Sequence, residues 1–248
     1  MKTKLYTFCY NERTILPFVV EYWKRFADDV KVFDNGSTDG SIDYLKNCGI
    51  DVQVEEYISK GGQDNFVMQD IKNTCWKEAR KNYDLVVVCD MDELLCAPNI
   101  YLSLCRMWSS GATVNIPNWY DFITDEQPEP RPGQMLHTYS PLAVRCPNPK
   151  VLLFNPNKIE EMNYSVGAHS CDPEGIVKLC QSDISVLHLN NNLSLDYKVD
   201  RYAMLNTRRS PQDIRAHHGV HYEQSSEELA RAYDIELSQA INFGELMR

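Results

Sequence analysis

Three acidic side chains follow an apolar run in the segment DLVVVCDMDELL, residues 84–95. Asp90, Asp92 and Glu93 come directly after residues 85–89, which have the composition of a buried strand. Carboxylates repel one another, and burying them costs free energy unless a cation joins them. The cation can be a lysine or arginine, a helix N-terminus or a divalent metal. The ordinary alternative is that these acids cap a helix that starts after the strand.

The elements around this cluster alternate between strand and helix patterns, which predicts an α/β fold. We expect strands at residues 4–10, 30–34, 51–57 and 85–90, and helices at residues 14–26, 42–47 and 64–82. The strand at 85–90 is apolar on both faces, as a central parallel strand should be. This repetition is typical of a Rossmann-like, mostly parallel sheet that is flanked by helices.

The pattern changes after Asp92 and predicts an antiparallel extension followed by helices. We expect strand and loop over 112–126, and strands at 141–146, 150–154, 163–170 and 183–189. From Ser194 the spacing becomes helical, and a capping box is expected between Ser225 and Glu228. The chain therefore divides into residues 1–110, 111–193 and 194–248.

Composition limits the classes of partner. The 248 residues carry a formal net charge of -10, which argues against nucleic-acid binding through a basic surface. An anionic ligand would need a local cation. The nine cysteines form no CxxC pair, and no apolar run resembles a signal peptide or a membrane span. We expect reduced thiols and a cytoplasmic protein without a transmembrane segment, with peripheral membrane contact left open.

Polar clusters follow three of the expected parallel strands, and the ends of such strands meet at one edge of a sheet. The clusters are YNE at residues 10–12, DNG at 34–36 and DMDE at 90–93. No GxGxxG follows the first strand and the chain has no GxxxxGK[ST], so dinucleotide binding is disfavoured and a P-loop is excluded. Acidic residues at strand ends instead suggest a hard cation that bridges to a phosphate.

Together these clusters resemble the signature set of family 2-like glycosyltransferases of the GT-A fold, over residues 4–96. The resemblance implies binding of a nucleotide-diphosphate sugar, with a UDP-sugar favoured. Residues 1–110 would then form the nucleotide-sugar-binding half and residues 111–193 the acceptor-side half of the same domain. Residues 194–248 would form a C-terminal helical segment.

The resemblance also implies roles for single residues. In the family, the position that matches Asp34 or Asn35 reads the base, and the DxD element holds Mn²⁺ or Mg²⁺ on the diphosphate. The metal-ligand candidates are Asp90, Asp92 and His188. The nucleotide-binding candidates are Tyr10, Asn11, Glu12, Asp34, Asn35, Gly36, Asp64, Asn65, Asp90 and Met91.

Several of these residues have ordinary alternatives. Glu12 and Asp64 could cap helices, and Asp34 could close its own loop. Trp119 and Tyr120 could stack on a sugar of the acceptor or form part of the core. His169 and His221 are further acceptor-side candidates, and the sequence does not rank the histidines. Arg208 and its neighbour Arg209 could meet the diphosphate, or could lie on a solvated face.

The family resemblance implies inversion, which needs a base to deprotonate the acceptor hydroxyl. Asp121, Asp125 and Glu126 lie in the expected region, and no motif selects one of them. The expected function is metal-dependent transfer of a sugar to a glycan or lipid-linked acceptor, in glycan or surface polysaccharide synthesis. The alternatives are a sugar-phosphate nucleotidyltransferase and a non-catalytic module that binds nucleotide sugars. CYNERT does not resemble the glycine-rich basic loop that a nucleotidyltransferase usually has.

Overall fold

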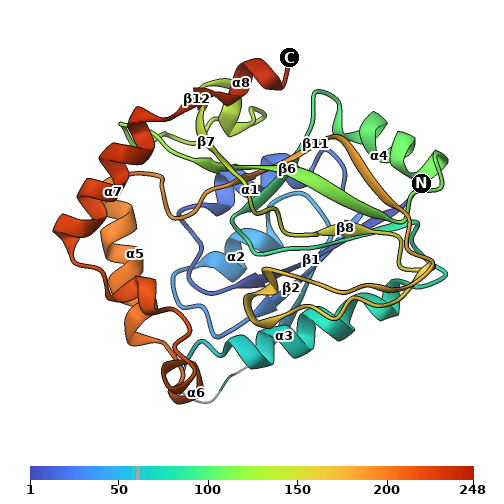
Figure 1. Ribbon diagram of the computed structural model, residues 1–248, viewed down its shortest axis with the longest axis horizontal. Coiled ribbons are helices and arrows are strands. Elements are labelled where there is room, and N and C mark those ends of the chain that lie inside the picture. The colour runs from blue at the N-terminus through green and yellow to red at the C-terminus, as the bar shows by residue number, and fades with distance from the viewer. Residues whose placement is uncertain (58, 60–61) are drawn as a thin grey trace.

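Four parallel strands form the N-terminal part of the central sheet (Figure 1). The computed structural model describes residues 1–57, 59 and 62–248. The strands lie in the order β4-β1-β2-β3. Their bounds are β1 Thr3–Cys9, β2 Asp29–Asp34, β3 Val52–Glu56 and β4 Leu85–Val88. Alternate residues of β1 are buried on opposite faces, with Leu5 in one core cluster and Tyr6 in the other. Burial of both faces explains the continuous apolar run of β4, whose four residues are all buried.

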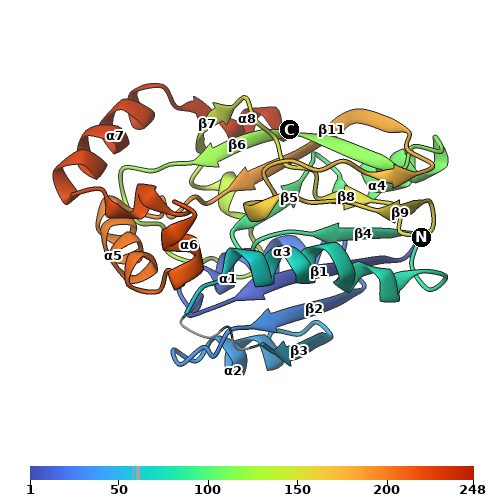
Figure 2. The ribbon, with the colours of Figure 1, turned by 60° about the horizontal axis from the view of Figure 1, so that its bottom comes forward.

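Helices cover both faces of this sheet (Figure 2). Trp23, Leu45 and Leu104 bring three helices into the core cluster on one face. The other face packs against Trp76, whose ring meets Phe154 edge-on at a centroid distance of 4.9 Å. The helices are α1 Leu16–Trp23, α2 Ser41–Lys46 and α4 Ile100–Ser109 on the first face, and α3 Asn65–Thr74 with the 3-10 helix η1 Cys75–Ala79 on the second.

The antiparallel extension continues the sheet beyond β4. Strand β8 pairs antiparallel with both β4 and β6, and β7 pairs antiparallel with β6. Strand β11 runs parallel to β6 and antiparallel to β5. The bounds are β5 Glu93–Cys96, β6 Val114–Phe122, β7 Leu142–Cys146, β8 Leu153–Phe154, β11 Leu179–His188 and β12 Ile241–Asn242, with β9 Ile159–Glu161 and β10 Glu174–Gly175 in a separate pair. The expected fold class is confirmed: a mostly parallel α/β sheet, an antiparallel extension and C-terminal helices.

Three C-terminal helices gather at the left of the sheet in Figures 1 and 2, and α8 lies apart from them, near the C-terminus and β7. The three are α5 Leu195–Thr207, α6 Pro211–Arg215 and α7 Ser226–Ser238, and α8 is Phe243–Leu246. Short 3-10 helices are η2 Leu136–Thr138, η3 Val166–Ala168 and η4 Val220–Glu223. The expected capping box at Ser225 and Glu228 opens α7, so that prediction is confirmed. Across the described residues, every helix is too short or too polar to traverse a bilayer.

Two local predictions were wrong, and one alternative is excluded. Residues 163–170 form a turn and η3 instead of a strand, because Gly167 and Ala168 both have positive φ angles, of 75° and 55°. The helix expected over 64–82 changes to 3-10 geometry at Cys75. The acidic cluster leads into strand β5, and the next helix is capped by Asn99, so the acids do not cap a helix.

A short backbone connection attaches the C-terminal segment to the N-terminal half. Gln63 N–H donates to the carbonyl of Arg208 at 2.7 Å, and Ser210 N–H donates to the carbonyl of Gln63 at 2.9 Å. Gly62 lies against this connection with a φ of 112°. A Cβ at Gly62 would clash with the carbonyl oxygen of Arg208. Glycine is therefore needed here for its lack of a side chain as well as for its φ angle.

We predict that Gly62→Ala destabilises the protein more than Gly111→Ala. Gly111 has a φ of 75°, and a Cβ added there would meet no described atom within 4 Å. Its replacement by alanine therefore costs only the penalty of a left-handed backbone, about 1 kcal/mol. The Gly62 variant adds the clash with Arg208. Urea denaturation of both variants measures the difference, and equal losses would show that the close approach is not required.

Candidate functional site

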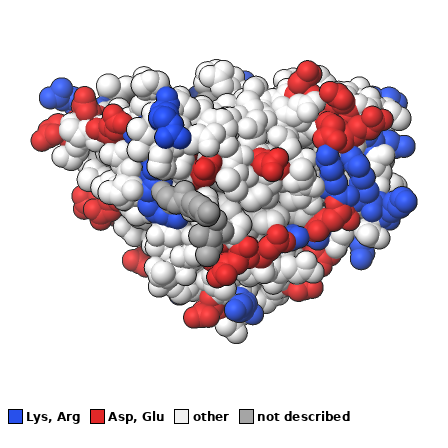
Figure 3. Space-filling view, turned by 90° about the horizontal axis from the view of Figure 1, so that it is seen from below, with Lys and Arg blue, Asp and Glu red and all other residues white. Residues whose placement is uncertain are grey.

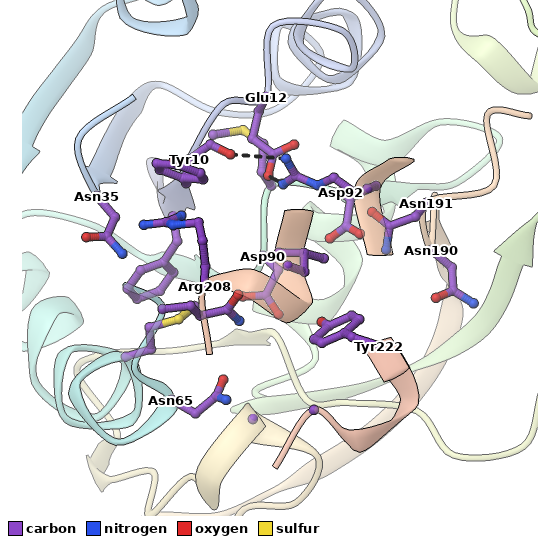
Figure 4. Close-up of a pocket in the computed structure, with 18 of the residues that line it drawn as sticks. Tyr10, Glu12, Asn35, Asn65, Asp90, Asp92, Asn190, Asn191, Arg208 and Tyr222 are labelled. Carbon is purple, nitrogen blue, oxygen red and sulfur yellow. Dashed lines mark hydrogen bonds and ion pairs between the residues drawn. The ribbon is translucent and has the colours of Figure 1, made fainter. Parts of the chain in front are cut away.

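A cavity of about 330 Å³ lies where β1, β2 and β4 end and where the C-terminal segment meets them (Figure 4). Its lining includes Tyr10, Glu12 and Asn35 after β1 and β2, and Asp90, Met91 and Asp92 after β4. The C-terminal segment adds Tyr197, Arg201, Tyr202, Arg208, His221 and Tyr222. Seen from below, the middle of the molecular surface is mostly uncharged around two separate acidic patches, and a band of acidic side chains runs from the lower middle toward a basic cluster at the right (Figure 3).

Two lysines meet the acidic cluster after β4. Lys72 of α3 lies with its Nζ 2.7 Å from Asp90 Oδ1. Lys150 lies with its Nζ 3.3 Å from Asp90 Oδ2 and 2.6 Å from Glu93 Oε1. Glu93 also accepts the backbone N–H of Asp90 at 2.8 Å. Part of the negative charge that the sequence places here is therefore neutralised by lysines.

These ion pairs stay charged at neutral pH. Burial would raise the pKa of Asp90, but Lys72 and Lys150 hold it well below its usual range. Burial would lower the pKa of Lys150, but Glu93 and Asp90 raise it well above its usual range. Asp90 was expected to be a metal ligand, and both of its carboxylate oxygens contact lysines instead.

A second network of charged side chains links Asp92, His188 and Asp121. His188 Nε2 lies 3.4 Å from Asp92 Oδ2, and His188 Nδ1 lies 2.8 Å from Asp121 Oδ1. The sheet sets this geometry, because His188 is directly opposite Asp121 on β6. Burial would lower the pKa of His188, but the two carboxylates raise it to about 10. The imidazole is therefore protonated in the metal-free protein.

The donor set of Asp92 and His188 fits a divalent metal. Both side chains line the cavity, and Asp121 holds the other ring nitrogen, an arrangement that orients histidine ligands in metal sites. The described residues contain no group of three or more His, Cys, Asp or Glu side chains placed to bind a metal. A metal here would complete its shell with water and phosphate oxygens, as Mg²⁺ commonly does. Loss of the His188 proton would accompany binding.

Aromatic and amide side chains form the other end of the cavity. The guanidinium of Arg208 stacks on the ring of Tyr10 at 3.0 Å from its centroid, and Asn35 lies beside this pair (Figure 4). Asn35 Nδ2 donates to Ser59 Oγ at 3.2 Å. The carboxylate of Asp34 instead accepts the backbone N–H groups of its own turn and does not line the cavity. Of the two base-reading candidates, only Asn35 faces the cavity.

An ion pair closes the top of the cavity as it is drawn in Figure 4. Arg201 pairs with Glu12, and it also donates to the carbonyl oxygens of Tyr10 at 3.2 Å and Asn11 at 3.0 Å. Glu12 therefore does not simply cap its helix. The side chain of Asn11 accepts the N–H of Thr38 at 2.7 Å.

The remaining nucleotide-binding candidates divide into two groups. Asn65 and Met91 line the cavity. Asp64 accepts two backbone N–H groups as the N-cap of α3, and neither it nor Asn11 nor Gly36 lines the cavity.

Two of the acceptor-side candidates line the cavity and two do not. Trp119 is buried and packs edge-on against His188 at 5.5 Å, and Tyr120 packs on Phe243 at 4.9 Å. Neither lines the cavity, so a place in the core fits this aromatic pair better than sugar stacking. His169 and His221 do line it.

The candidate bases do not line the cavity. Asp121 lies directly behind the lining, where it contacts His188 at 2.8 Å. Asp125 and Glu126 are exposed residues of the loop after β6.

Sequence reasoning missed Lys72, Lys150 and Arg201. Lys72 is next to the apolar stripe of its helix, which is a weak signal that it could be buried with a partner. Lys150 and Arg201 are far in sequence from the acids that they contact, and no local pattern marks either.

Comparisons with known proteins show distant structural similarity. No protein-family model matches the chain, and no curated protein matches its sequence. S. aureus TarS 1-349 is 13% identical with a TM-score of 0.43, over 82% of this chain and 66% of that chain. Glucosyl-3-phosphoglycerate synthase from Mycobacterium tuberculosis, in complex with Mn²⁺, UDP and glucosyl-3-phosphoglycerate, is 13% identical with a TM-score of 0.41, over 85% of this chain and 81% of that chain.

A third similar structure is the Mn/GDP form of core-mannan synthase A from Aspergillus fumigatus. It is 8% identical with a TM-score of 0.34, over 48% of this chain and 42% of that chain. The chain spans less than two thirds of the length of this synthase and of TarS 1-349. At such identities and TM-scores the similarity assigns no function to this chain.

We predict that Lys150→Met lowers the free energy of unfolding by about 3 to 5 kcal/mol, because it leaves the buried Glu93 carboxylate without a cation. The double variant Lys150→Met/Glu93→Gln should recover most of the loss. Lys158→Met, at an exposed position, is the matched control and should be neutral. Urea denaturation measures all three, and a neutral Lys150→Met would refute the structural role of the pair.

Proposed function

We propose that this chain is a metal-dependent glycosyltransferase that moves a sugar from a nucleotide diphosphate to an acceptor hydroxyl. The observation that carries the proposal is the pairing of Asp92 with His188 in the same cavity as the stacked Tyr10 and Arg208. One end offers ligands to a metal, and the other offers an aromatic ring, an amide and a guanidinium to a nucleotide. A nucleoside diphosphate with a bound cation has both parts.

The charge of the site supports a metal requirement. Four basic side chains, Lys72, Lys150, Arg201 and Arg208, lie with five carboxylates, those of Glu12, Asp90, Asp92, Glu93 and Asp121. His188 is protonated in the metal-free protein, so these side chains carry no net charge together, and a diphosphate gains no net attraction from them. A divalent cation would add the positive charge that a protein of net charge -10 does not otherwise offer to a diphosphate.

The protein's own residues have separate tasks in this proposal. Asp92 and His188 would hold the metal, and Asp121 keeps the His188 ring oriented. The bound metal would supply Lewis-acid stabilisation of the charge that develops on the departing diphosphate. Arg208 lies where its guanidinium can reach either the base or the phosphates. Lys72 and Lys150 hold Asp90 in place between them.

The finer parts of the proposal follow from the resemblance of the sequence motifs. We infer an inverting reaction, Mn²⁺ or Mg²⁺ as the metal, a UDP-sugar as donor and a glycan or lipid-linked acceptor in surface polysaccharide synthesis. A reducing, cytoplasmic location suits the nine cysteines, all of which are free thiols. A nucleotidyltransferase would release pyrophosphate from a nucleoside triphosphate instead of UDP from a UDP-sugar, so product analysis separates the two reactions.

We predict that UDP raises the melting temperature only when Mn²⁺ or Mg²⁺ is present. A ligand at 100 times its Kd stabilises the folded state by about 2.7 kcal/mol. Asp92→Asn should remove this shift and lower the melting temperature of the free protein only slightly, because it ends the ion pair with His188 but leaves His188 paired with Asp121. Asp200→Asn, at an exposed position outside the cavity, is the matched control. An equal UDP shift in EDTA would contradict the metal requirement.

A further inference from the structure

An inverting displacement needs a base beside the acceptor. The described carboxylates that line the cavity are all paired with basic side chains. Glu12 pairs with Arg201, Asp90 contacts two lysines and Asp92 contacts His188. Protonating Asp90 or Asp92 would break an ion pair or disturb the proposed metal site. Burial raises the pKa of Glu12 to about 8, but its carboxylate is held by Arg201. The group that takes the acceptor proton is therefore to be sought among the other side chains of the cavity.

Four histidines of the described residues line the cavity, and their surroundings separate them. Both ring nitrogens of His188 face carboxylates. His221 stacks on Tyr222 at a centroid distance of 4.0 Å, and His218 meets Phe66 at 5.6 Å. The rings of His169 and His221 are both exposed and form no hydrogen bond with the described residues, and of the four only His169 also makes no aromatic contact with them.

The backbone before His169 is shaped to present its ring. Gly167 and Ala168 have successive φ angles of 75° and 55°, and a positive φ is uncommon for alanine. Ser165 holds the turn, because its carbonyl accepts the N–H of Ala168 at 2.8 Å and its N–H donates to Ser170 at 2.9 Å. A Cβ at position 167 would lie 2.9 Å from Cδ2 of His169, so only glycine leaves room for the ring there.

The charged groups nearest to His169 favour a neutral imidazole. Burial lowers its pKa, and the positive charges of Lys150 and Lys72 lower it further, while Asp90 acts in the opposite direction. Lys150, Lys72 and Asp90 line the same cavity as Asp92 and His188, the proposed metal ligands. The pKa of His221 is lowered by burial and by Arg209 instead, on the side of the C-terminal segment.

We propose that His169 is the general base that deprotonates the acceptor hydroxyl; this rests on the proposed function and extends it. The acceptor O–H proton moves to a ring nitrogen of His169 as the acceptor oxygen forms a bond to the anomeric carbon. The bond from that carbon to the diphosphate oxygen breaks, and its electron pair leaves with the diphosphate. For inversion, the acceptor oxygen must approach the anomeric carbon from the side of His169, opposite the diphosphate.

The test separates base catalysis from nucleotide binding. His169→Gln is compared with His221→Gln, the rival histidine, and with His217→Gln, an exposed histidine that does not line the cavity. Thermal shifts with UDP and Mn²⁺ measure binding. Release of UDP from UDP-glucose, UDP-galactose and UDP-N-acetylglucosamine, with monosaccharides as acceptors, measures turnover.

We expect His169→Gln to keep the UDP and Mn²⁺ shift and to lose at least about 100-fold in kcat, the lower limit for a general base. The cavity opened by His169→Gly should let added imidazole restore part of the turnover, which a structural role would not allow. Gly167→Ala should lower kcat by displacing the ring while the shift remains.

Each other outcome has a defined meaning. Turnover of His169→Gln at the wild-type rate overturns the assignment, and so does a loss in His221→Gln alone. Loss of the UDP and Mn²⁺ shift in His169→Gln also overturns it, because the residue would then act in binding. A wild-type protein that shows neither the shift nor UDP release would overturn the proposed function itself.

Discussion

The ion pairs of Lys150 hold together the edge of the sheet on which the site is built. Its ammonium joins Asp90 at the end of the central strand to Glu93 at the start of β5, and Glu93 is fully buried. Without this cation, the carboxylates would repel one another inside the protein. The chain could not then turn from the parallel sheet into β5 with Asp92 left facing the cavity. The position of Asp92, and with it the proposed metal site, depends on a lysine that takes no part in the motif.

The rest of the cavity depends on the C-terminal segment. Arg201 and Arg208 come from α5 and its end, and they contact residues that directly follow β1. The close approach of Gly62 to the carbonyl of Arg208 holds that end of α5 against the N-terminal half. The end of the cavity that contains Tyr10 and Arg208 is thus made by two parts of the chain that are distant in sequence. Either part alone would present only half of the lining.

The strand ends and their polar clusters could be predicted, because local periodicity and composition decide where a strand stops. Tyr10, Asn35 and Asp92 came together as the parallel sheet required. The partners of these residues could not be predicted, because an ion pair such as Lys150–Glu93 or Arg201–Glu12 leaves no short-range pattern. Residues 163–170 were wrongly predicted to form a strand. Their composition is strand-like, but Gly167 and Ala168 adopt left-handed backbone angles that end a strand. The pairing of Asp121 with His188 could not be predicted either, because it is set by the register of β6 and β11.

The ion pair between Glu12 and Arg201 joins residues that are 189 positions apart in the chain. Contacts of such long sequence separation form late in folding, because the entropy of closing a large loop has to be overcome first. During synthesis, the N-terminal sheet emerges long before α5 can reach it. The lining of the cavity is therefore complete only after α5 has packed against the N-terminal half. The proposed nucleotide binding would be a property of the finished fold, because the residues that follow β1 and β2 supply only part of that lining.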